Sequence, residues 1–339
     1  MNVCSNCFAD PELKGFIISF NNKGVCAFCG EQNEYVVDIK ELLDFFQELF
    51  DNFTTADIGP SLPELLQMEW EVFSSFEISK KILNHIIPLV DTDISSNSIS
   101  VNYIDDIVEN YSHWFDLKVN LKWSNRFISD IGLLEEYGWD GFFNTQYQLD
   151  NSVDLYRARV HHESGLSPYK ESDMMCPKKE KTRGGRANPL GIPYLYLCDN
   201  PDTVLYEVRA SYLDEISVGK FRVYKNKSPL KIVDFTEKTS LFRPEGNINE
   251  IIKAKLLRDI ISRDLSKPMR RYDSEIEYIP TQFICEFIRV FTGAMGIRFR
   301  SSLHPEGKNI VIFDQELMEC VEVELKRVDK LNLSANNIL

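Results

Sequence analysis

Apolar positions recur at helical spacing through the first half of the chain. In VDIKELLDFFQELF, residues 37–50, they repeat every three to four residues and form one broad apolar face. Similar spacing appears at 62–76, 78–90, 102–116 and 122–138, and the polar run DTDISSNSIS at 91–100 interrupts it. The pattern predicts a helical bundle over residues 37–148, in which the aromatic side chains form a core and no ligand site.

From about residue 152 the pattern changes to short strands mixed with helices. Strands are predicted at LYRARV, YLYLCD, NIVIF and ECVEVELKRV, and FRVYKN and LKIVDF are predicted to pair with each other. Helices are predicted at NPDTVLYEVRASYL, NEIIKAKLLRDIIS and PTQFICEFIRVF, the last ending at Gly293. Because strands and helices do not alternate regularly, this half predicts an α+β sheet domain over residues 152–335.

The helix predicted from residue 200 onward places a carboxylate beside its apolar face. Asn200 or Asp199 can serve as its N-cap, with Pro201 in the first turn. Its predicted apolar set is Val204, Leu205, Val208 and Tyr212. Glu207 then lies at the flank of the buried face, where its side chain can face a cleft instead of bulk solvent.

Composition narrows the class of protein. The chain has 339 residues, of which 43% are hydrophobic and 12% aromatic, which is enough for two or three globular domains. No apolar run approaches the ~18–20 residues of a membrane span, and the N-terminus lacks the pattern of a secretory signal, so a cytoplasmic protein is expected. A formal net charge of −14 weighs against a nucleic-acid-coating role but leaves room for a local basic site.

Four of the eight cysteines form two C-x2-C pairs near the N-terminus: Cys4 with Cys7, and Cys26 with Cys29. Two such pairs can complete a tetrahedral four-sulfur shell for zinc, and a shell of four cysteines leaves no open position for catalysis. We therefore expect a structural Zn²⁺ in a zinc-ribbon-like module over residues 1–36, with a short hairpin between the pairs. Disulfides, a redox pair and unliganded thiols remain alternatives.

Small helical bundles of the HEPN type can be ribonucleases, so this possibility is tested for the predicted bundle. Their chemistry needs an Arg and a His four to six residues apart on one helix. Neither His85 nor His113 has an Arg at that upstream spacing, and the apparent match of Arg157 with His162 falls in a predicted strand and loop. The bundle is therefore predicted to be catalytically silent.

Cationic, aromatic and acidic side chains gather in the second half around a Pro/Gly turn. KKEKTRGGR, residues 178–186, holds five basic residues and one acid, and GRANPLGIPYLYLCDNPDTVLYEVRA follows. Arginine offers planar pairs of donors to phosphate oxygens, so Arg157 and Arg186 predict a site for a diphosphate. In the same stretch Glu207 supplies a carboxylate, and Tyr196 can stack on a planar ring.

The ordered motifs LYRAR, GRANPLGIPYLYLCDNPDTVLYEVR, EYIPTQFICEFIR, GIRFRSS and EGKNIVIF resemble the RES domain family over residues 152–315. The cysteine pairs and the helices after them resemble the region described as HEPN/RES N-terminal. The family is named for its Arg, Glu and Ser, which the resemblance places at Arg157, Glu207 and Ser301. It matches Arg186 and Tyr196 to further pocket positions. Ser302 is a close alternative to Ser301 as the family serine, and Arg159 is a weaker alternative to Arg157 as the family arginine.

The resemblance implies a fold related to ADP-ribosyltransferases and an enzyme that consumes NAD⁺. The leading hypothesis is NAD⁺ degradation at the nicotinamide–ribose bond, with water or phosphate as acceptor and Ser301 holding the carboxamide or a ribose. Alternatives are an ADP-ribosyltransferase acting on a macromolecule and an inactive, zinc-stabilised interaction protein. The family also implies a toxin with an antitoxin or regulatory partner, and a role in phage defence. The chain could also form a homo-oligomer. The N-terminal half could restrain the activity of the second half, sense a trigger, or serve as a dimerisation element.

Overall fold

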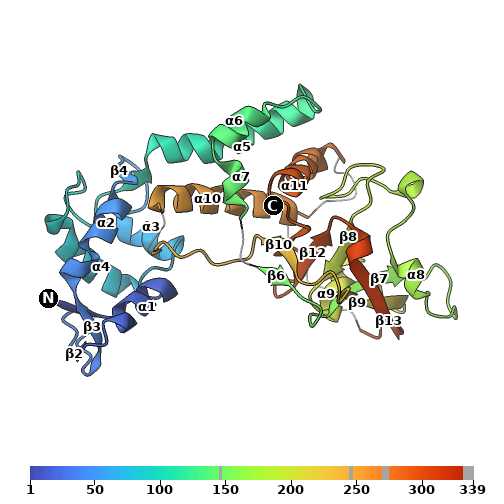
Figure 1. The fold of residues 1–339 in the computed structure, drawn as a ribbon, viewed down its shortest axis with the longest axis horizontal. Coiled ribbons are helices and arrows are strands. Elements are labelled where there is room, and N and C mark those ends of the chain that lie inside the picture. The colour runs from blue at the N-terminus through green and yellow to red at the C-terminus, as the bar shows by residue number, and fades with distance from the viewer. Residues whose placement is uncertain (145–146, 244–246, 269–274, 331–339) are drawn as a thin grey trace, which may run out of the picture. The chain divides into compact units, whose positions relative to one another are not determined.

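The computed structural model describes residues 1–144, 147–243, 247–268 and 275–330 (Figure 1). The chain divides into two compact units. Unit 1 comprises Met1–Trp114 and Lys238–Leu257, and unit 2 comprises Phe115–Glu237 and Arg258–Leu339. The division falls inside helices α5 (Asp105–Trp123) and α10 (Ile248–Ser266), so each of these helices contributes residues to both units.

Unit 1 combines a three-stranded sheet, a two-stranded sheet and several short helices. The larger sheet has the order β1-β3-β2, and β4 pairs antiparallel with β5. The strands of unit 1 are β1 (Asn2–Cys4), β2 (Lys23–Gly24), β3 (Glu34–Asp38), β4 (Phe53–Thr55) and β5 (Val101–Tyr103). Its helices, besides parts of α5 and α10, are α1 (Pro11–Ser19), α2 (Leu43–Phe50), α3 (Leu62–Met68), α4 (Phe76–Ile86) and the 3-10 turns η1 (Ser5–Cys7), η2 (Ile39–Leu42) and η3 (Ile87–Leu89).

A helix, α1, occupies the segment between the two cysteine pairs, so the predicted hairpin there is wrong. The Asp10 carboxylate accepts the backbone N–H groups of Glu12 and Leu13, and Pro11 takes the first helical position. Leu13 and Ile17 are buried beneath the helix. A local cap and one apolar face therefore outweigh the glycine and asparagine content that predicted a turn.

Helix boundaries elsewhere in unit 1 also differ from the predictions. Residues 37 and 38 end strand β3, and the helix begins only after Asp38, whose side chain accepts the Lys40 N–H. The segment predicted as helix 102–116 starts as strand β5 and continues as the longer helix α5. In the stretch 122–138, α5 ends at Trp123 and the remainder forms only the short helix α6 (Ile131–Glu136).

One hydrophobic core runs through unit 1. It includes three of the clustered cysteines together with large side chains from the helices, such as Phe46 and Leu83. The same core takes in Phe242 and Ile252, which come from the second half of the chain. The cysteine-bearing segment and the helices are therefore held by shared apolar packing.

Unit 2 is built on an eight-stranded sheet of order β13-β9-β7-β8-β12-β11-β10-β6. Its pairs are antiparallel except that of β10 with β11, which is parallel. The strands are β6 (Gln148–Leu149), β7 (Leu155–Val160), β8 (Leu195–Cys198), β9 (Glu215–Val223), β10 (Leu230–Asp234), β11 (Gly296–Arg300), β12 (Lys308–Ile312) and β13 (Met318–Arg327). Mixed strands and helices around this sheet confirm the predicted α+β class.

The helices of unit 2 are mostly short. Besides α6 and the second parts of α5 and α10, they are α7 (Trp139–Phe142), α8 (Glu171–Met174), α9 (Pro201–Glu207), α11 (Ile279–Phe291) and the 3-10 turns η4 (Lys179–Lys181), η5 (Glu275–Tyr278) and η6 (Gln315–Leu317). Alternate strand residues enter separate apolar clusters, as Leu197 and Cys198 do on β8. The sheet thus has apolar packing on both faces. The last residues of the predicted domain, 331–335, lie outside the described chain.

FRVYKN and LKIVDF lie in the same sheet but do not pair, so that prediction is wrong. Strand β9 pairs with β7 and β13, whereas β10 pairs with β6 and β11. Closeness in sequence favours a hairpin, but each of these strands has both edges filled by partners from distant parts of the chain.

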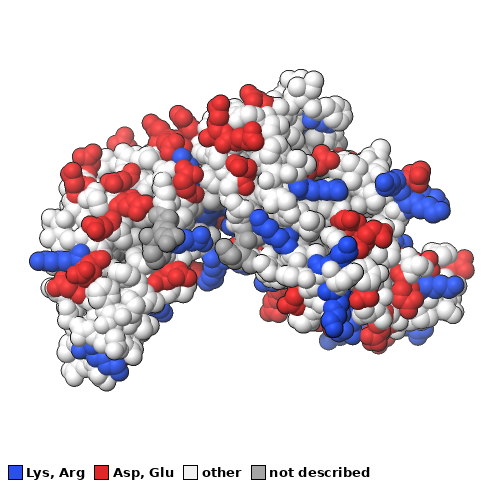
Figure 2. Space-filling view, in the orientation of Figure 1, with Lys and Arg blue, Asp and Glu red and all other residues white. Residues whose placement is uncertain are grey.

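Basic and acidic groups both occur on the face of the molecule drawn in Figure 2. Over the whole chain acidic residues outnumber basic ones, 52 to 38. Within the described ranges, no helix combines the length and the apolar character needed to cross a membrane.

Candidate functional site

A pocket opens in unit 2 where strands β7 and β8 diverge. These two strands share a single paired position, Tyr156 with Cys198. The pocket has a volume of about 390 Å³, within the range of small-molecule sites. Its lining includes four of the residues that the sequence singled out: Arg157, Tyr196, Arg186 and Glu207. Side chains that are far apart in the sequence therefore meet around one cavity.

Glu207 is the last residue of α9, and local signals fix where that helix begins and ends. The Asn200 side chain accepts the N–H groups of Asp202 and Thr203 at its start. After Glu207, Arg209 adopts a left-handed backbone with φ of 52°, which stops the helix. The helix predicted to continue to residue 213 is thus six residues shorter, and Tyr212, predicted to be apolar core, is exposed.

One oxygen of the Glu207 carboxylate is held by two donors. Ser301 Oγ donates to Glu207 Oε1 at 2.7 Å, and Asn309 Nδ2 donates to the same oxygen at 2.8 Å. Ser301 and Asn309 are buried. Two hydrogen bonds to one oxygen fix the plane of the carboxylate beside the pocket.

The surroundings of Ser301 direct its proton toward Glu207. Ser301 Oγ accepts the backbone N–H groups of Leu303 at 3.2 Å and His304 at 3.1 Å. A hydroxyl has two acceptor sites and one proton, so with both acceptor sites used the proton is left for Glu207. Ser301 is not among the residues lining the pocket, and its neighbour Ser302 is exposed.

Arg157 contributes a half-buried guanidinium side chain to the pocket wall. Its Nη1 atom is shielded from solvent and has no hydrogen-bond partner within the described chain. Burial lowers the pKa of the guanidinium. A buried, unsatisfied cationic donor is costly unless an anion binds to it. Arg159, the alternative candidate for the family arginine, donates to the Met175 carbonyl at 2.7 Å.

Arg186 lies on a loop that α10 and α11 hold in place. Its guanidinium donates to the Leu265 carbonyl near the end of α10. Its own carbonyl accepts a bond from Thr281 Oγ1 at 2.6 Å, and Gln282 Nε2 donates to the Gly185 carbonyl at 2.8 Å. The preceding residues 178–181 and Arg183 are exposed and do not line the pocket.

Tyr196 connects the sheet to the same loop. Its hydroxyl donates to Asn188 Oδ1 at 2.8 Å and accepts the Ala187 N–H at 3.0 Å. Burial raises the pKa of the Tyr196 phenol, so it stays neutral and can donate. A side chain at Gly185 would place its Cβ 2.6 Å from Asn188 Oδ1 and 2.8 Å from the Tyr196 hydroxyl. Glycine is therefore required for this close approach.

Sequence reasoning missed Asn309 and Cys198. Asn309 is a buried polar residue that precedes the three apolar residues of strand β12, and the Cys198 thiol donates to its Oδ1 at 3.3 Å. A polar side chain next to an apolar strand segment is the signal that could have identified it. Arg157 and His162, the apparent HEPN pair, do not share a helix, as predicted. Arg157 lies on strand β7, and His162 follows that strand.

Residues 154–334, more than half of the chain, match the RES domain. The chain belongs to the RES domain family. A solved structure similar to this RES chain is the M. tuberculosis MbcT–MbcA toxin–antitoxin complex, with 15% identity, a TM-score of 0.31, and coverage of 56% of this chain and 92% of that one. That likeness is too weak to carry a function. No curated protein matches the chain.

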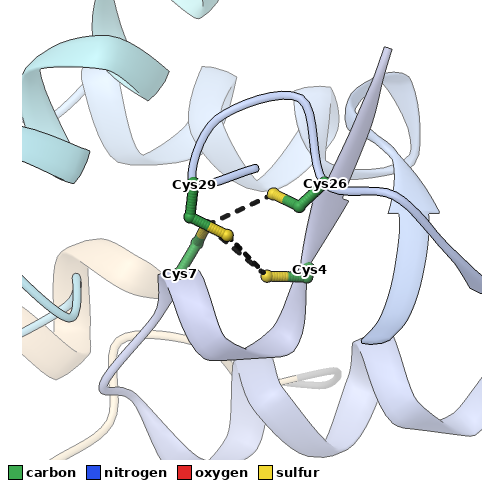
Figure 3. Close-up of side chains that lie close together, drawn as sticks. All are labelled: Cys4, Cys7, Cys26 and Cys29. Atoms are coloured by element: carbon green, nitrogen blue, oxygen red, sulfur yellow. Dashed lines mark hydrogen bonds between the residues drawn. The ribbon is translucent and has the colours of Figure 1, made fainter. Parts of the chain in front are cut away.

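The four N-terminal cysteines of this RES protein converge in unit 1 (Figure 3). The Cys4–Cys7 Sγ distance is 3.6 Å, and the Cys4–Cys29 and Cys7–Cys26 distances are both 3.5 Å. A tetrahedral zinc site with Zn–S bonds of about 2.3 Å has sulfur–sulfur edges of about 3.8 Å. The cluster therefore fits a zinc ion with slight expansion.

The electrostatics of the cluster also suit a metal. Burial raises the pKa of Cys4 to about 12 and also raises the pKa of Cys7. Burial opposes the Cys26 thiolate as well, but N–H donors from Cys29, Phe28 and Cys4 outweigh it and lower the pKa of Cys26 to about 7. Thiolates this close repel one another, and a bound cation removes that repulsion.

Proposed function

We propose that the unit 2 pocket binds NAD⁺ and cleaves its nicotinamide–ribose bond. The observation that carries the proposal is the Glu207 carboxylate, held by two donors, in one pocket with the half-buried guanidinium of Arg157, whose Nη1 atom is shielded from solvent. Family membership supports NAD⁺ as the substrate class. Arg157 and Arg186 would bind the diphosphate, and Tyr196 would pack against a ring of the ligand.

In this reaction the bond between the nicotinamide nitrogen and ribose C1′ breaks, and its electron pair leaves with nicotinamide. The ribose carries oxocarbenium-like positive charge, which the Glu207 carboxylate stabilises. A water oxygen then bonds to C1′, and its proton passes to Glu207 and on to solvent, giving ADP-ribose. With inorganic phosphate as acceptor, a phosphate oxygen forms the new bond instead.

The proposal is tested with purified protein and NAD⁺ alone, in phosphate-containing and phosphate-free buffers, by measuring free nicotinamide and the ribose product. We expect turnover in at least one buffer, and the product identifies the acceptor. Glu207→Gln is expected to lower kcat by about 10²-fold or more. The matched control is Asp202→Asn, an exposed carboxylate in the first turn of the same helix, which should keep full activity.

Two results would contradict this reading. Turnover only after a macromolecule is added, with ADP-ribose attached to it, would indicate a transferase. Absence of turnover under every condition, with NAD⁺ failing to bind, would indicate an interaction protein.

Family membership also leads us to propose a toxin-like role in cells, neutralised by an antitoxin. Expression in a bacterial host should lower cellular NAD⁺ and stop growth, and Glu207→Gln should relieve both effects. Growth arrest that persists in the variant, with NAD⁺ unchanged, would contradict the proposal.

We propose zinc as the ion of the cysteine cluster. With four protein sulfurs its role would be to stabilise unit 1, with no open position for chemistry.

A further inference from the structure

A second, smaller pocket lies next to the first in unit 2. Its walls come from the second half of α5, the end of α10 and the start of α11 (labelled in Figure 1). Its volume is about 140 Å³, about a third of the 390 Å³ of the first pocket. That is below the ~300–1,000 Å³ of pockets that enclose whole small molecules, so it suits one small group. We call it the lysine pocket, because Lys118, Lys122 and Lys267 line it.

The two pockets share a wall. Tyr278 lines both of them. Thr281 lines the lysine pocket, and its Oγ1 lies 2.6 Å from the Arg186 carbonyl oxygen and 3.0 Å from that of Tyr278. The Arg186 guanidinium donates to the carbonyl of Leu265, which follows Asp264 of the lysine pocket. Arg186, which lines the first pocket, is therefore at the boundary between the two.

The lysine pocket carries an excess of positive charge. Lys118 pairs with Asp264 at 2.9 Å, and Lys122 pairs with Glu277 at 2.8 Å. Lys267, an exposed residue just after α10, adds a third cation. Three lysines and two carboxylates give the pocket a formal charge of +1 in a chain whose net charge is −14. An ammonium has three donors, so a lysine that pairs with one carboxylate can also donate to a phosphate.

A dinucleotide in the first pocket would extend toward the lysine pocket. In the proposed function the nicotinamide ribose lies at Glu207 and the diphosphate at Arg186. The first pocket is near the lower end of the size range for small-molecule sites, so the adenosine continues beyond Arg186. Tyr278 lines the wall there, and its ring can stack on adenine. A substituent on the adenosine ribose can then reach the lysine pocket.

We propose that the lysine pocket binds the 2′-phosphate on the adenosine ribose of NADP⁺, so that the chain takes NADP⁺ in preference to NAD⁺. The inference rests on the proposed function, because it extends the same bound dinucleotide. NAD⁺ carries a hydroxyl at that position, whereas a phosphate monoester carries about −1.5 to −2 charges at pH 7. Lys122 and Lys267 would donate charge-assisted hydrogen bonds to this phosphate, and a neutral hydroxyl gains much less from the same cations.

The preference is tested by calorimetric titration of the Glu207→Gln variant, which should hold either dinucleotide uncleaved, in phosphate-free buffer. NADP⁺ should bind at least about 10-fold more tightly than NAD⁺, the gain expected of one charge-assisted hydrogen bond. Adding Lys267→Glu should abolish this ratio, because a carboxylate then faces the phosphate. The matched control is Lys225→Glu, at an exposed lysine that lines neither pocket, and it should keep the ratio.

A second variant tests the path between the pockets. Tyr278→Ala should weaken the binding of both dinucleotides by about 10-fold and leave their ratio unchanged, because both lose the same stacking contact. Tyr278→Phe retains the ring and should restore the binding. Circular dichroism verifies that each variant is folded.

Inorganic phosphate offers the same chemistry as the 2′-phosphate, so it is titrated alone. Phosphate binding that depends on Lys267, with NADP⁺ no tighter than NAD⁺, would assign the pocket to the free ion and overturn the proposal. A preference for NADP⁺ that survives Lys267→Glu would overturn it too. Both results leave cleavage of NAD⁺ intact. Conversely, a Lys267-dependent preference for NADP⁺ without nicotinamide release by the parent chain would support the lysine pocket and contradict only the proposed cleavage.

Discussion

At the scale of single residues, the two adjacent serines that the sequence could not separate have different surroundings. Ser301 donates to Glu207 and is buried, whereas Ser302 is exposed. We predict that Ser301→Ala lowers kcat for NAD⁺ cleavage by about 10-fold, because Glu207 loses one of two donors that orient it. Ser302→Ala is the matched control and should stay close to parental activity. Nicotinamide-release kinetics measure both, and equal losses would show that the contact with Glu207 is unimportant.

Asn309, which lines the pocket, is predicted to act by orienting Glu207. Asn309→Ala removes one of the two donors to Glu207 and should lower kcat by about 10-fold with little change in KM. Asn309→Asp replaces the donor by a carboxylate of the same size, which cannot donate to Glu207 and repels it, so kcat should fall further. Nicotinamide-release kinetics measure both, and an unchanged kcat in both variants would contradict the assignment.

The sequence predicted which residues line the pocket, but not which of them hydrogen-bond to one another. The motifs identified Arg157, Arg186, Tyr196 and Glu207, and the structure places all four around one cavity. Asn309 was missed because its partner lies 102 residues away in sequence, where neither periodicity nor spacing relates the two.

At the scale of elements, the loop bearing Arg186 depends on close packing at Gly185. Gly185→Ala is predicted to displace this loop, because the new Cβ would lie 2.6 Å from Asn188 Oδ1. With Arg186 moved, KM for NAD⁺ should rise by about 10-fold, the cost of one weakened charged hydrogen bond. Gly184→Ala is the adjacent control, since its nearest neighbour, Gln282 Nε2, would lie at an ordinary 3.5 Å. Steady-state kinetics measure KM for NAD⁺ in both variants. Similar KM values would show that close packing at Gly185 does not position Arg186.

Element boundaries show which signals were decisive. Helix α11 was predicted closely because Pro280 at its start, its apolar face and Gly293 after its end all agree. The predicted helix α9 was too long, because the helix ends at the left-handed backbone of Arg209. Local sequence rarely predicts that conformation for a residue other than glycine. Strands β9 and β10 were wrongly paired because their partners come from distant segments, which local patterns cannot specify.

At the scale of the whole molecule, the cysteine cluster belongs to a core larger than its own segment. Cys4, Cys7 and Cys26 pack in the same apolar cluster as the helices of unit 1, together with Phe242 and Ile252 from the second half of the chain. Loss of a bound ion would therefore expose repelling thiolates inside the packing of all of unit 1, while unit 2 retains separate apolar clusters. Zinc binding and the stability of unit 1 should consequently be linked.

We predict one zinc per chain by elemental analysis. Cys7→Ser should abolish it and lower the first calorimetric transition by about 10 °C or more, because a structural zinc site contributes several kcal/mol. Cys320→Ser is the control, a partly buried thiol on β13 in unit 2, and should keep both zinc and the transition. A strong chelator should reproduce the Cys7→Ser effect on the parent chain, and added Zn²⁺ should reverse it there but not in the variant. A parent chain that carries no zinc would contradict the metal site. An unchanged first transition in Cys7→Ser would show that the cluster does not stabilise unit 1.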